Sequence, residues 1–451
     1  MLLQRLADRR AVSRCHLHQP RSSRKSGGSS GIGRYQARLL AGLAVLLGVV
    51  AATLGADRTL AAGAAVAAPC RALTLAANRT TDAGAALQAC LDATPAGGRI
   101  ELAPGHYRLA TPVRLDHPLT LTTRGSTPDA PACSTNERRC ALLHLAIAAA
   151  PPSAGAVMPF EVASDRARID RLVFVGTRRS DPALSARRCA LDTERPMGGG
   201  LRVNGNAITI TRSVFRDMAC YSALEYGRGA GAVIRDNDFT TNGTHTAELR
   251  WADGLTIHDV TGFRVTDNRF RDNTDVQLIL GGCVGCTITN NRFAHGGTAA
   301  GGSFAELMLQ AWPNATSGDF TGTRTAGNRI DCGARRRCGF GLMIGSAPWY
   351  AAPAFGGTVT RNRVRGAMLA LNVDSLTGAM TIADNDLATA SGTWPSACGP
   401  QRTAPAAANV SPASRGFLAP ATIPAGATAR RYCILNHPGP APAPPPPAAA
   451  P

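Results

Sequence analysis

Short runs of alternating apolar and polar residues recur through the middle of the chain, and each ends with an asparagine two positions before an apolar residue. These runs are VIRDNDF (233–239), FRVTDNRF (263–270), CTITNNRF (286–293), TRTAGNRI (323–330), GTVTRNRV (357–364) and MTIADNDL (380–387). More divergent copies are ITITRSVF (208–215) and ARIDRLVF (167–174). Alternation with period two is typical of β-strands with one buried face. Repeats of this spacing, 23 residues at the shortest, predict an all-β solenoid whose coils each hold three short strands.

The repeated asparagine has a physical role in such a solenoid. Asparagine tolerates the left-handed backbone angles of a tight turn, and its amide can bond the same residue in the coils above and below. With coils about 4.8 Å apart, we expect a buried ladder along one corner. The members of this ladder are Asn237, Asn268, Asn291, Asn328, Asn362 and Asn385.

With these repeats the chain resembles the pectate-lyase-like β-helix superfamily, which includes polysaccharide lyases and polygalacturonase-like glycoside hydrolases. Its beginning agrees, because 81–88 reads as a capped amphipathic helix and a strand ending in Pro-Gly-His-Tyr (104–107) follows. The resemblance covers about 81–387 and implies a right-handed single-stranded parallel β-helix with an N-terminal capping helix. It is specific for the fold and much less specific for the reaction.

The flanking segments predict an exported protein. An apolar stretch at 39–56 follows a basic stretch, which is the layout of a secretory signal. We therefore predict a periplasmic or secreted protein, attached to a membrane only if this segment stays uncleaved. The predicted parts are a signal or anchor segment (1–67), the β-helix domain (68–395), a C-terminal cap (396–437) and a disordered Pro/Ala-rich tail (438–451).

Cysteine usage agrees with export. Of 13 cysteines, Cys15 would be lost with the signal, and the others fall into the neighbouring pairs 70/90, 133/140, 189/220, 283/286, 332/338 and 398/433. An even number in an exported chain predicts disulfides, although the sequence alone does not fix which cysteines pair. We expect bonds between 332 and 338 and between 398 and 433. A metal site at Cys283 and Cys286 is the weaker alternative, because a structural zinc ion needs two more ligands nearby.

The chain is strongly basic, with a formal net charge of +18 at pH 7, yet Lys25 is its only lysine. This bias toward arginine, together with abundant alanine, is typical of a GC-rich coding sequence. Attraction to an acidic polymer is the alternative interpretation. We expect a polysaccharide partner, acidic in the alternative case, and no nucleic acid.

In the related superfamily the ladder marks the turn between the second and third strands of each coil, which locates the first strands. These are ALEYG (223–227), DGLTIHD (253–259), DVQLILGG (275–282), AELMLQAW (305–312) and GLMIGS (341–346). Alternation then points inward Leu255, Ile257, Val276, Leu278, Leu307 and Leu309. The outward row holds Glu225, Thr256, His258, Asp275, Gln277, Glu306 and Gln310.

The resemblance places active sites along this first-strand face, where carboxylates gather. Asp253 and Asp275 start first strands of adjacent coils, so we expect their carboxylates about 5–9 Å apart, as glycoside hydrolysis requires. The hypothesis makes them the catalytic acid/base pair, assisted by Glu306 and His258. The same carboxylates could bind Ca²⁺, and the alternative structural role is that the two aspartates cap turns.

Candidate substrate-binding residues surround this row. The loop at 244–252 supplies Glu248, Arg250 and Trp251, while Gln277 and Gln310 lie on the strands. Aromatic side chains after later first strands suit stacking against sugar rings, namely Trp312, Trp349 and Tyr350. Packing of these rings beneath their own loops is the alternative.

The favoured function is an exported glycoside hydrolase that uses paired carboxylates. Asn273-Thr274-Asp275 matches a triplet of polygalacturonase-like hydrolases, but that family's Asp-Asp, Gly-His-Gly and Arg-Ile-Lys motifs are missing. A Ca²⁺-assisted polyuronate lyase is the first alternative, and no metal ligand set is assigned. A non-catalytic, glycan-binding or adhesive surface β-helix is the second.

Overall fold

The structure is a computed structural model, and its described part is one stack of β-strand coils with short flanking elements. The described residues are 70, 73, 80–147, 158–189, 197–244, 250–296, 302–333, 338–346, 352–389, 392–394, 401–403 and 408–418. The predicted signal segment, most of the predicted cap and the predicted tail lie outside this part.

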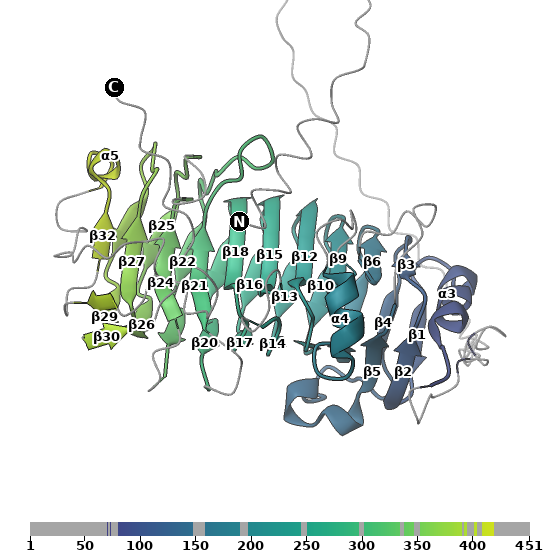
Figure 1. Cartoon of the computed structure of the whole chain (residues 1–451). Helices are drawn as coiled ribbons and strands as arrows, with labels where there is room; N and C mark the ends of the chain where they lie inside the picture. Colours follow the sequence, from purple (N-terminus) through teal and green to yellow (C-terminus); the bar gives the residue numbers. More distant parts are fainter. Residues whose placement is uncertain are drawn as a thin grey trace, which may run out of the picture. The chain divides into compact units, whose positions relative to one another are not determined.

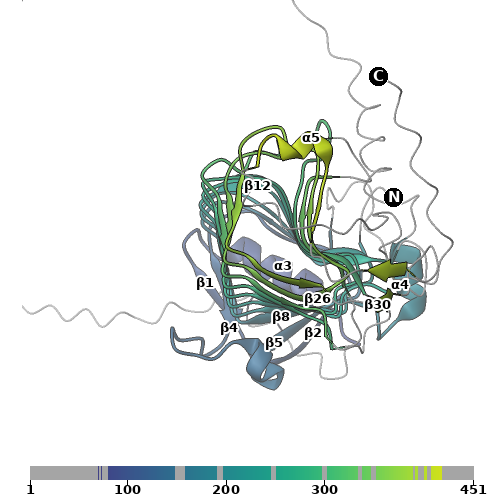
Figure 2. The same ribbon diagram turned by 90° about the vertical axis from the view of Figure 1, so that its left-hand side faces the viewer.

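Three parallel sheets of ten strands each run along the stack, and every coil contributes one strand to each sheet. The strands lie side by side in Figure 1, and Figure 2 shows the three sides of the coils almost end on. Consecutive coils pair in parallel register, for example Val265 with Ile288 and Phe270 with Phe293. The predicted right-handed parallel β-helix is confirmed.

Each sheet takes its strands in chain order. Sheet B holds β1 (Arg99–Leu102), β4 (Thr120–Thr123), β7 (Arg168–Asp170), β10 (Thr209–Thr211), β13 (Val233–Arg235), β16 (Arg264–Thr266), β19 (Thr287–Thr289), β22 (Arg324–Ala326), β25 (Thr358–Thr360) and β28 (Thr381–Ala383). Sheet A holds β2 (Gly105–Leu109), β5 (Ala141–Leu145), β8 (Leu172–Val175), β11 (Val214–Arg216), β14 (Asp238–Thr240), β17 (Arg269–Arg271), β20 (Arg292–Ala294), β23 (Arg329–Asp331), β26 (Arg363–Ala367) and β29 (Asp386–Thr389). Sheet C holds β3 (Val113–Leu115), β6 (Phe160–Ala163), β9 (Leu201–Asn204), β12 (Tyr221–Ala230), β15 (Ala252–Thr261), β18 (Val276–Val284), β21 (Ser303–Leu309), β24 (Cys338–Ile344), β27 (Leu369–Val373) and β32 (Ala408–Val410).

Short elements complete the described part. The helices are α3 (Gly84–Ala93), α4 (Pro182–Arg188) and α5 (Pro412–Arg415), with 3₁₀ turns η1 (Cys133–Thr135) and η2 (Glu137–Arg139). An antiparallel pair consists of β30 (Gly392–Trp394) and β31 (Gln401–Thr403). Strand β32 pairs in parallel with β27, so sheet C continues into residues 408–410.

The apolar residue that ends each repeat builds the core of sheet A. Phe174, Phe215, Phe239, Phe270 and Phe293 stack with ring centroids 4.9 to 5.0 Å apart. Successive coils place identical rings at the coil spacing, which suits aromatic stacking. The repeat pattern therefore sets both the register and the packing of this sheet.

The predicted asparagine ladder is confirmed. Each side-chain amide Nδ2 donates to Oδ1 of the next asparagine at 2.9 to 3.1 Å, from Asn237 through Asn385. Each Nδ2 also donates to a backbone carbonyl, as from Asn291 to Val265 at 2.9 Å. The ladder therefore satisfies polar groups that are almost wholly buried.

One detail of the ladder differs from expectation. The left-handed backbone angles belong to the residue before each ladder asparagine and not to the asparagine itself. These preceding residues are Asp236, Asp267, Asn290, Gly327, Arg361 and Asp384, with φ between 53° and 68°. The reversal at this corner therefore turns the asparagine side chain into the core, where the amides meet.

A helix begins the stack, as expected, but it starts later. The sequence predicted it over 81–88, and α3 spans Gly84–Ala93 with Leu87 and Leu91 buried. Asp82 accepts hydrogen bonds from the backbone of Gly84 and Ala110, so its carboxylate also ties the helix start to the first coil.

Five disulfides are present in the described part, each joins neighbouring cysteines, and the predicted 332–338 bond is among them. They link 70–90, 133–140, 189–220, 283–286 and 332–338, and the predicted 398–433 bond lies outside it. Such a set of disulfides is typical of exported proteins. The helices of the described part include none that is long and apolar enough to cross a membrane.

Candidate active site

The first strands do not alternate strictly at their start, and this changes which side chains share a face. A Cβ on Gly254 would meet the amide of Asn273 at 2.9 Å and the core ring of Phe270 at 3.0 Å, so position 254 faces inward. The next residue, Leu255, also lies in the main core. Positions 254 and 255 therefore both face inward, between the outward positions 253 and 256.

The outer face of sheet C consequently carries residues three positions apart. Thr256 Oγ1 donates to Asp253 Oδ2 at 2.8 Å, which shows that these two side chains share the face. In the next coil Val276 and Ile279 both belong to a second apolar cluster with Met308, separate from the main core. The expectation that Val276 points into the main core was wrong for this reason.

Asp253 is buried among polar groups of this face. Its residue is 6% exposed, and its carboxylate accepts from Thr256, from Ser222 Oγ at 3.4 Å and from the backbone amide of Val276 at 3.0 Å. Burial, followed by the charge of Asp275, raises the pKa of Asp253 well above its usual value. Burial and the neighbouring charge therefore both favour the protonated form of Asp253.

Asp275 lies at the start of β18, one coil along from Asp253. Its backbone amide donates to Ala252 at 3.2 Å, which holds it beside the start of β15. Burial raises the pKa of Asp275 to about 6. The charge of Asp275 contributes to the raised pKa of Asp253, while the separation of about 5–9 Å between the two carboxylates stays a prediction.

A second polar group lies in the same face and centres on Glu225. His258 Nε2 lies 2.9 Å from Glu225 Oε1, and Arg202 donates to Oε2 at 2.8 Å. The imidazole of His258 packs against the indole of Trp312 with centroids 5.0 Å apart. Sequence reasoning found His258 but missed Arg202, although Arg202 pairs with Glu225 in register across β9 and β12.

Gln277 and Glu306 were expected on the outward row, and the structure contradicts this. Gln277 Oε1 accepts from Asn273 in the interior, and its Nε2 lies 3.0 Å from His295 Nε2. Glu306 is wholly buried and lies 2.9 Å from the same nitrogen of His295. Both side chains occupy the first of the two consecutive positions that face inward, in register with Gly254, so they cannot reach a ligand on the outer face.

His295 is the centre of this internal network and was not singled out in the sequence. Its Nδ1 lies 3.3 Å from Asp272, opposite the contact to Glu306. Burial by itself would lower the pKa of His295, but Glu306 and Asp272 raise it to about 9. A lone histidine after a sheet A strand carries no sequence signal for such a role.

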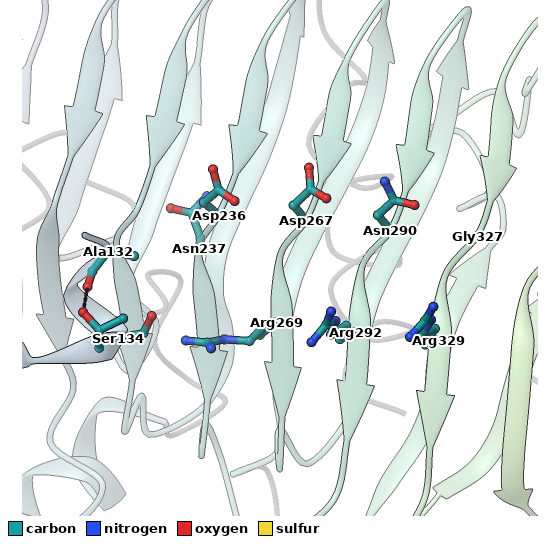
Figure 3. Close-up of a pocket in the computed structure, with 11 residues that line it drawn as sticks. Ala132, Ser134, Asp236, Asn237, Asp267, Arg269, Asn290, Arg292, Gly327 and Arg329 are labelled. Carbon is teal, nitrogen blue, oxygen red and sulfur yellow. Dashed lines mark hydrogen bonds between the residues drawn. The ribbon is translucent and has the colours of Figure 1, made fainter. Parts of the chain in front are cut away.

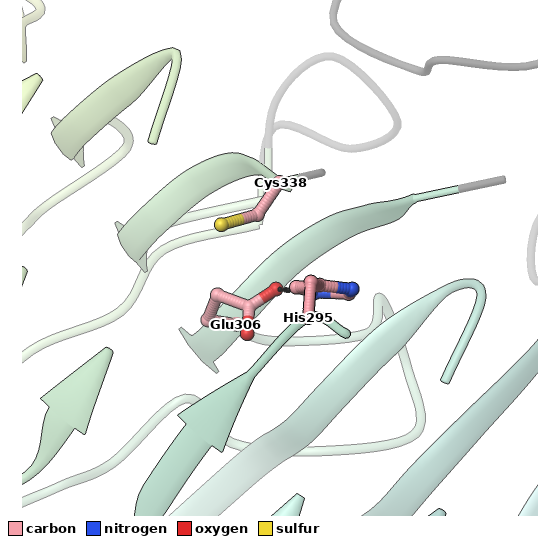
Figure 4. Close-up of side chains that lie close together, drawn as sticks. All are labelled: His295, Glu306 and Cys338. Carbon is pink, nitrogen blue, oxygen red and sulfur yellow. Dashed lines mark hydrogen bonds and ion pairs between the residues drawn. The ribbon is translucent and has the colours of Figure 1, made fainter. Parts of the chain in front are cut away.

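Figure 4 shows His295 and Glu306 close to Cys338, an arrangement with the appearance of a metal site. Cys338 is bonded to Cys332, so its sulfur offers no thiolate. Two donors remain, and the nearby Asp272 is turned to the other nitrogen of His295. These residues therefore suit a buried ion pair better than a structural zinc ion.

Two further substrate candidates on strands are buried. Gln310 has no exposed surface, and neither its Oε1 nor its Nε2 has a partner among the described residues. Trp312 is 4% exposed and covers Gly281. The expectation of an exposed aromatic at Trp312 was wrong, and packing beneath its own loop is what the structure shows.

The loop candidates divide between described and undescribed parts. Arg250 and Trp251 are partly exposed, and Trp251 packs against the second apolar cluster. Glu248, Trp349 and Tyr350 lie outside the described residues. Their role in substrate binding stays a prediction.

The family model described as "Right handed beta helix region" matches residues 191–346. No curated protein matches the chain. Similar solved structures include an alginate lyase from Paenibacillus sp. str. FPU-7, at 14% identity and TM-score 0.46, covering 67% of this chain and 92% of that one. The PfbA adhesin of Streptococcus pneumoniae is similar at 12% identity and TM-score 0.47, covering 70% and 83%. A DFA-IIIase from Arthrobacter chlorophenolicus A6 is similar at 15% identity and TM-score 0.36, covering 66% and 83%.

The family model extends over coils that contain both candidate aspartates and four of the six ladder asparagines. Three parallel ten-stranded sheets complete the evidence for the fold. The chain therefore folds as a right-handed parallel β-helix, and its residues 191–346 match the family model of that region.

Proposed function

We propose that the protein is an exported glycoside hydrolase that cleaves a polysaccharide at the outer face of sheet C. The observation that carries the proposal is that Asp253 and Asp275 lie in adjacent coils and both have raised pKa values. Hydrolysis of a glycosidic bond needs one carboxyl group that holds a proton near neutral pH and another that is ionised.

The two environments suggest which group has which role. Asp253 has its pKa raised further, because its burial is joined by the charge of Asp275. It is therefore the proton donor to the glycosidic oxygen. Asp275, with a pKa of about 6, is ionised at neutral pH.

The reaction balances as follows. The bond between the anomeric carbon and the glycosidic oxygen breaks as the proton of Asp253 passes to the leaving oxygen. Ionised Asp275 stabilises the positive charge that develops on the sugar, and a water molecule supplies the new hydroxyl group. The proton released by the water restores Asp253.

The Glu225 group positions the substrate in this proposal. Both oxygens of Glu225 are engaged, by His258 and by Arg202. His258 Nδ1 has no partner among the described residues, so it is available to a sugar hydroxyl. The contact with Trp312 restricts the ring and fixes the direction of this bond.

The Ca²⁺-assisted lyase fits the aspartates less well. Calcium prefers ionised carboxylates, whereas burial favours the protonated form of Asp253. Both oxygens of Asp253 also accept hydrogen bonds from described groups. The donor set therefore favours acid catalysis over calcium binding.

The experiment is a screen of the purified protein against neutral and uronate-containing polysaccharides, reading reducing ends and near-ultraviolet absorbance in parallel. We expect new reducing ends without the absorbance of an unsaturated product. Asp253→Asn and Asp275→Asn should each lower turnover by about 10²–10⁴-fold, because asparagine cannot exchange a proton. Asp384→Asn is the matched control, because Asp384 is exposed at a corner whose left-handed backbone suits asparagine.

The outcomes separate the alternatives. An unsaturated product would assign the protein to the lyases, and binding without any product would assign it to glycan-binding surface proteins. Full turnover in both aspartate variants contradicts the paired-carboxylate mechanism. We further infer action in the periplasm or outside the cell, supported by the disulfides, and fractionation of the native host tests this.

A further inference from the structure

The corner between sheets B and A carries two parallel rows of residues. One row is formed by the left-handed corner residues Asp236, Asp267, Asn290, Gly327, Arg361 and Asp384. The other is formed by the first residues of the sheet A strands, which pair in register as Asp238, Arg269, Arg292, Arg329, Arg363 and Asp386. Each coil therefore presents one residue of each row.

The charge of these rows changes along the stack. Acidic residues occupy both positions in the first coil, Asp236 and Asp238, and in the last coil, Asp384 and Asp386. Three consecutive coils between them carry only cationic and neutral residues, namely Asn290 with Arg292, Gly327 with Arg329, and Arg361 with Arg363. The rows thus form a short cationic stretch with acidic ends.

The central arginines of the stretch form no ion pair with any residue that the structure describes. Arg269 pairs with Asp238 at 3.0 Å and Arg363 lies 3.8 Å from Asp386, so the acidic ends neutralise the outer members. Arg292 and Arg329 are exposed and have no side-chain partner among the described residues. Stacked about 4.8 Å apart, their like charges repel until an anion lies between or across them.

A groove of about 530 Å³ runs between the two rows. Figure 3 shows Arg269, Arg292 and Arg329 in line along one side and Asp236, Asp267 and Asn290 along the other. Ser134 and Thr135 of η1 close the end beside the acidic coil. The groove therefore offers guanidinium groups at one side and hydroxyl-binding oxygens at the other; we call it the arginine groove.

We propose that the arginine groove binds a uronate-containing polysaccharide, at a surface separate from the outer face of sheet C. A guanidinium pairs with a carboxylate through two parallel hydrogen bonds, so Arg292 and Arg329 can each hold one uronate carboxylate. The free carboxylate of Asp267 and the amide of Asn290 can accept bonds from sugar hydroxyls on the opposite side. The arginine groove would thus be the surface at which the positively charged chain binds an acidic polymer.

The acidic members of the groove argue against a nucleic acid. A nucleic acid strand carries a phosphate at every nucleotide, and Asp236 and Asp267 would repel such a backbone. A uronate carries its charge on a carboxylate and presents hydroxyl groups beside it. These hydroxyl groups can donate hydrogen bonds to aspartate. The groove therefore matches the mixed chemistry of an acidic sugar.

Calorimetric titration of the purified full chain is the test, with a uronate oligosaccharide, a neutral oligosaccharide, a densely sulfated glycan and a single-stranded DNA oligonucleotide as probes. We expect the uronate oligosaccharide to bind most tightly. The double variant Arg292→Gln and Arg329→Gln should weaken it at least about ten-fold, because two guanidinium–carboxylate pairs are lost. The matched control changes Arg264 and Arg324 to glutamine, since these are exposed arginines on neighbouring sheet B, and should stay within about two-fold.

Three results would overturn the proposal: equal losses in the two double variants, tighter binding of DNA or of the sulfated glycan, or no binding of the uronate probe. The test is independent of the hydrolase proposal. Asp253→Asn should keep full affinity at the arginine groove even if it abolishes turnover. If Asp253→Asn loses turnover but keeps uronate binding, the hydrolase proposal and the arginine-groove proposal are tested separately.

Discussion

The outer face of sheet C and the arginine groove both stack like charges in successive coils, but the charges are buried in the first and exposed in the second. In both, successive coils stack charged residues at the coil spacing. Asp253 is buried beside another carboxyl group, with 6% of its surface exposed, whereas Arg292 is exposed beside another arginine. Solvent screens the repulsion between like charges at the surface. A buried carboxylate beside another carboxylate instead takes up a proton, which removes the repulsion.

The comparison extends to a paired carboxylate in the corner that leads to the groove. Burial alone would raise the pKa of Asp170, but hydrogen bonds from Arg212, Ser126 and Thr211 lower it below its usual value. Arg212 Nη2 lies 2.7 Å from Asp170 Oδ2. Two aspartates of similar burial thus have opposite pKa shifts, and the presence of a cationic partner decides the sign.

The largest expected effect concerns the buried network behind sheet C. His295→Leu should lower the free energy of unfolding by about 3–5 kcal/mol, because Glu306 and Asp272 lose their buried cation. The pKa of His295 is raised from 6.5 to about 9, so its contribution is complete below pH 6.5 and is lost as pH rises through 9. Urea unfolding at several pH values measures this. A flat profile in the wild type would contradict a charged His295, and His295→Gln is the control without a titrating group.

The next effect concerns the paired aspartate. Asp170→Asn should lower stability at neutral pH by about 1.5–3 kcal/mol, since charge-assisted bonds to Arg212 weaken. The pKa of Asp170 is lowered in the folded state, so this stability is present above about pH 3.9 and is lost as pH falls. The deficit of the variant should therefore shrink in acid. A deficit that stays constant with pH would assign the loss to packing.

Asp253 should show the opposite sign. Its pKa is raised in the folded state, so the wild type loses stability as pH rises above about 3.9, because folding then holds a proton that the unfolded chain releases. Asp253→Asn should be at least as stable as the wild type at pH 8 and should remove this part of the pH dependence. Unfolding of the variant would instead favour turn capping. Thermal unfolding at pH 4, 6 and 8 distinguishes these results.

The smallest effect belongs to the arginine groove. Replacing Arg292 and Arg329 with glutamine should raise stability by at most about 0.5 kcal/mol, and only at low salt, because exposed like charges are well screened. Unfolding in urea, a denaturant that adds no salt, at two ionic strengths is the measurement. A large destabilisation would show that these arginines have a packing role in sheet A.

The fold was predictable because its signals are local and repeated. Each asparagine sits two residues before an apolar residue, and every copy reports the same corner of the coil. Errors in one copy are corrected by the others. The 332–338 disulfide was likewise predictable, because a short loop brings the two cysteines together.

The candidate site was predictable only in part. Asp253, Asp275 and His258 lie on or beside the outer face of sheet C, but Gln277 and Glu306 turn inward. Strict alternation assigns side chains correctly only while the strand keeps its pleat. The two consecutive inward positions break that rule, and no residue type in the sequence marks the break.

The sequence by itself determined the solenoid, its ladder and its register, because these follow from a periodic pattern that each coil repeats. The tertiary structure decided which charges meet. Arg292 and Arg329 are 37 residues apart in the chain and become neighbours only through coil stacking. Whether a stacked charge is buried or exposed depends on what covers it, and that is set by the folded chain as a whole.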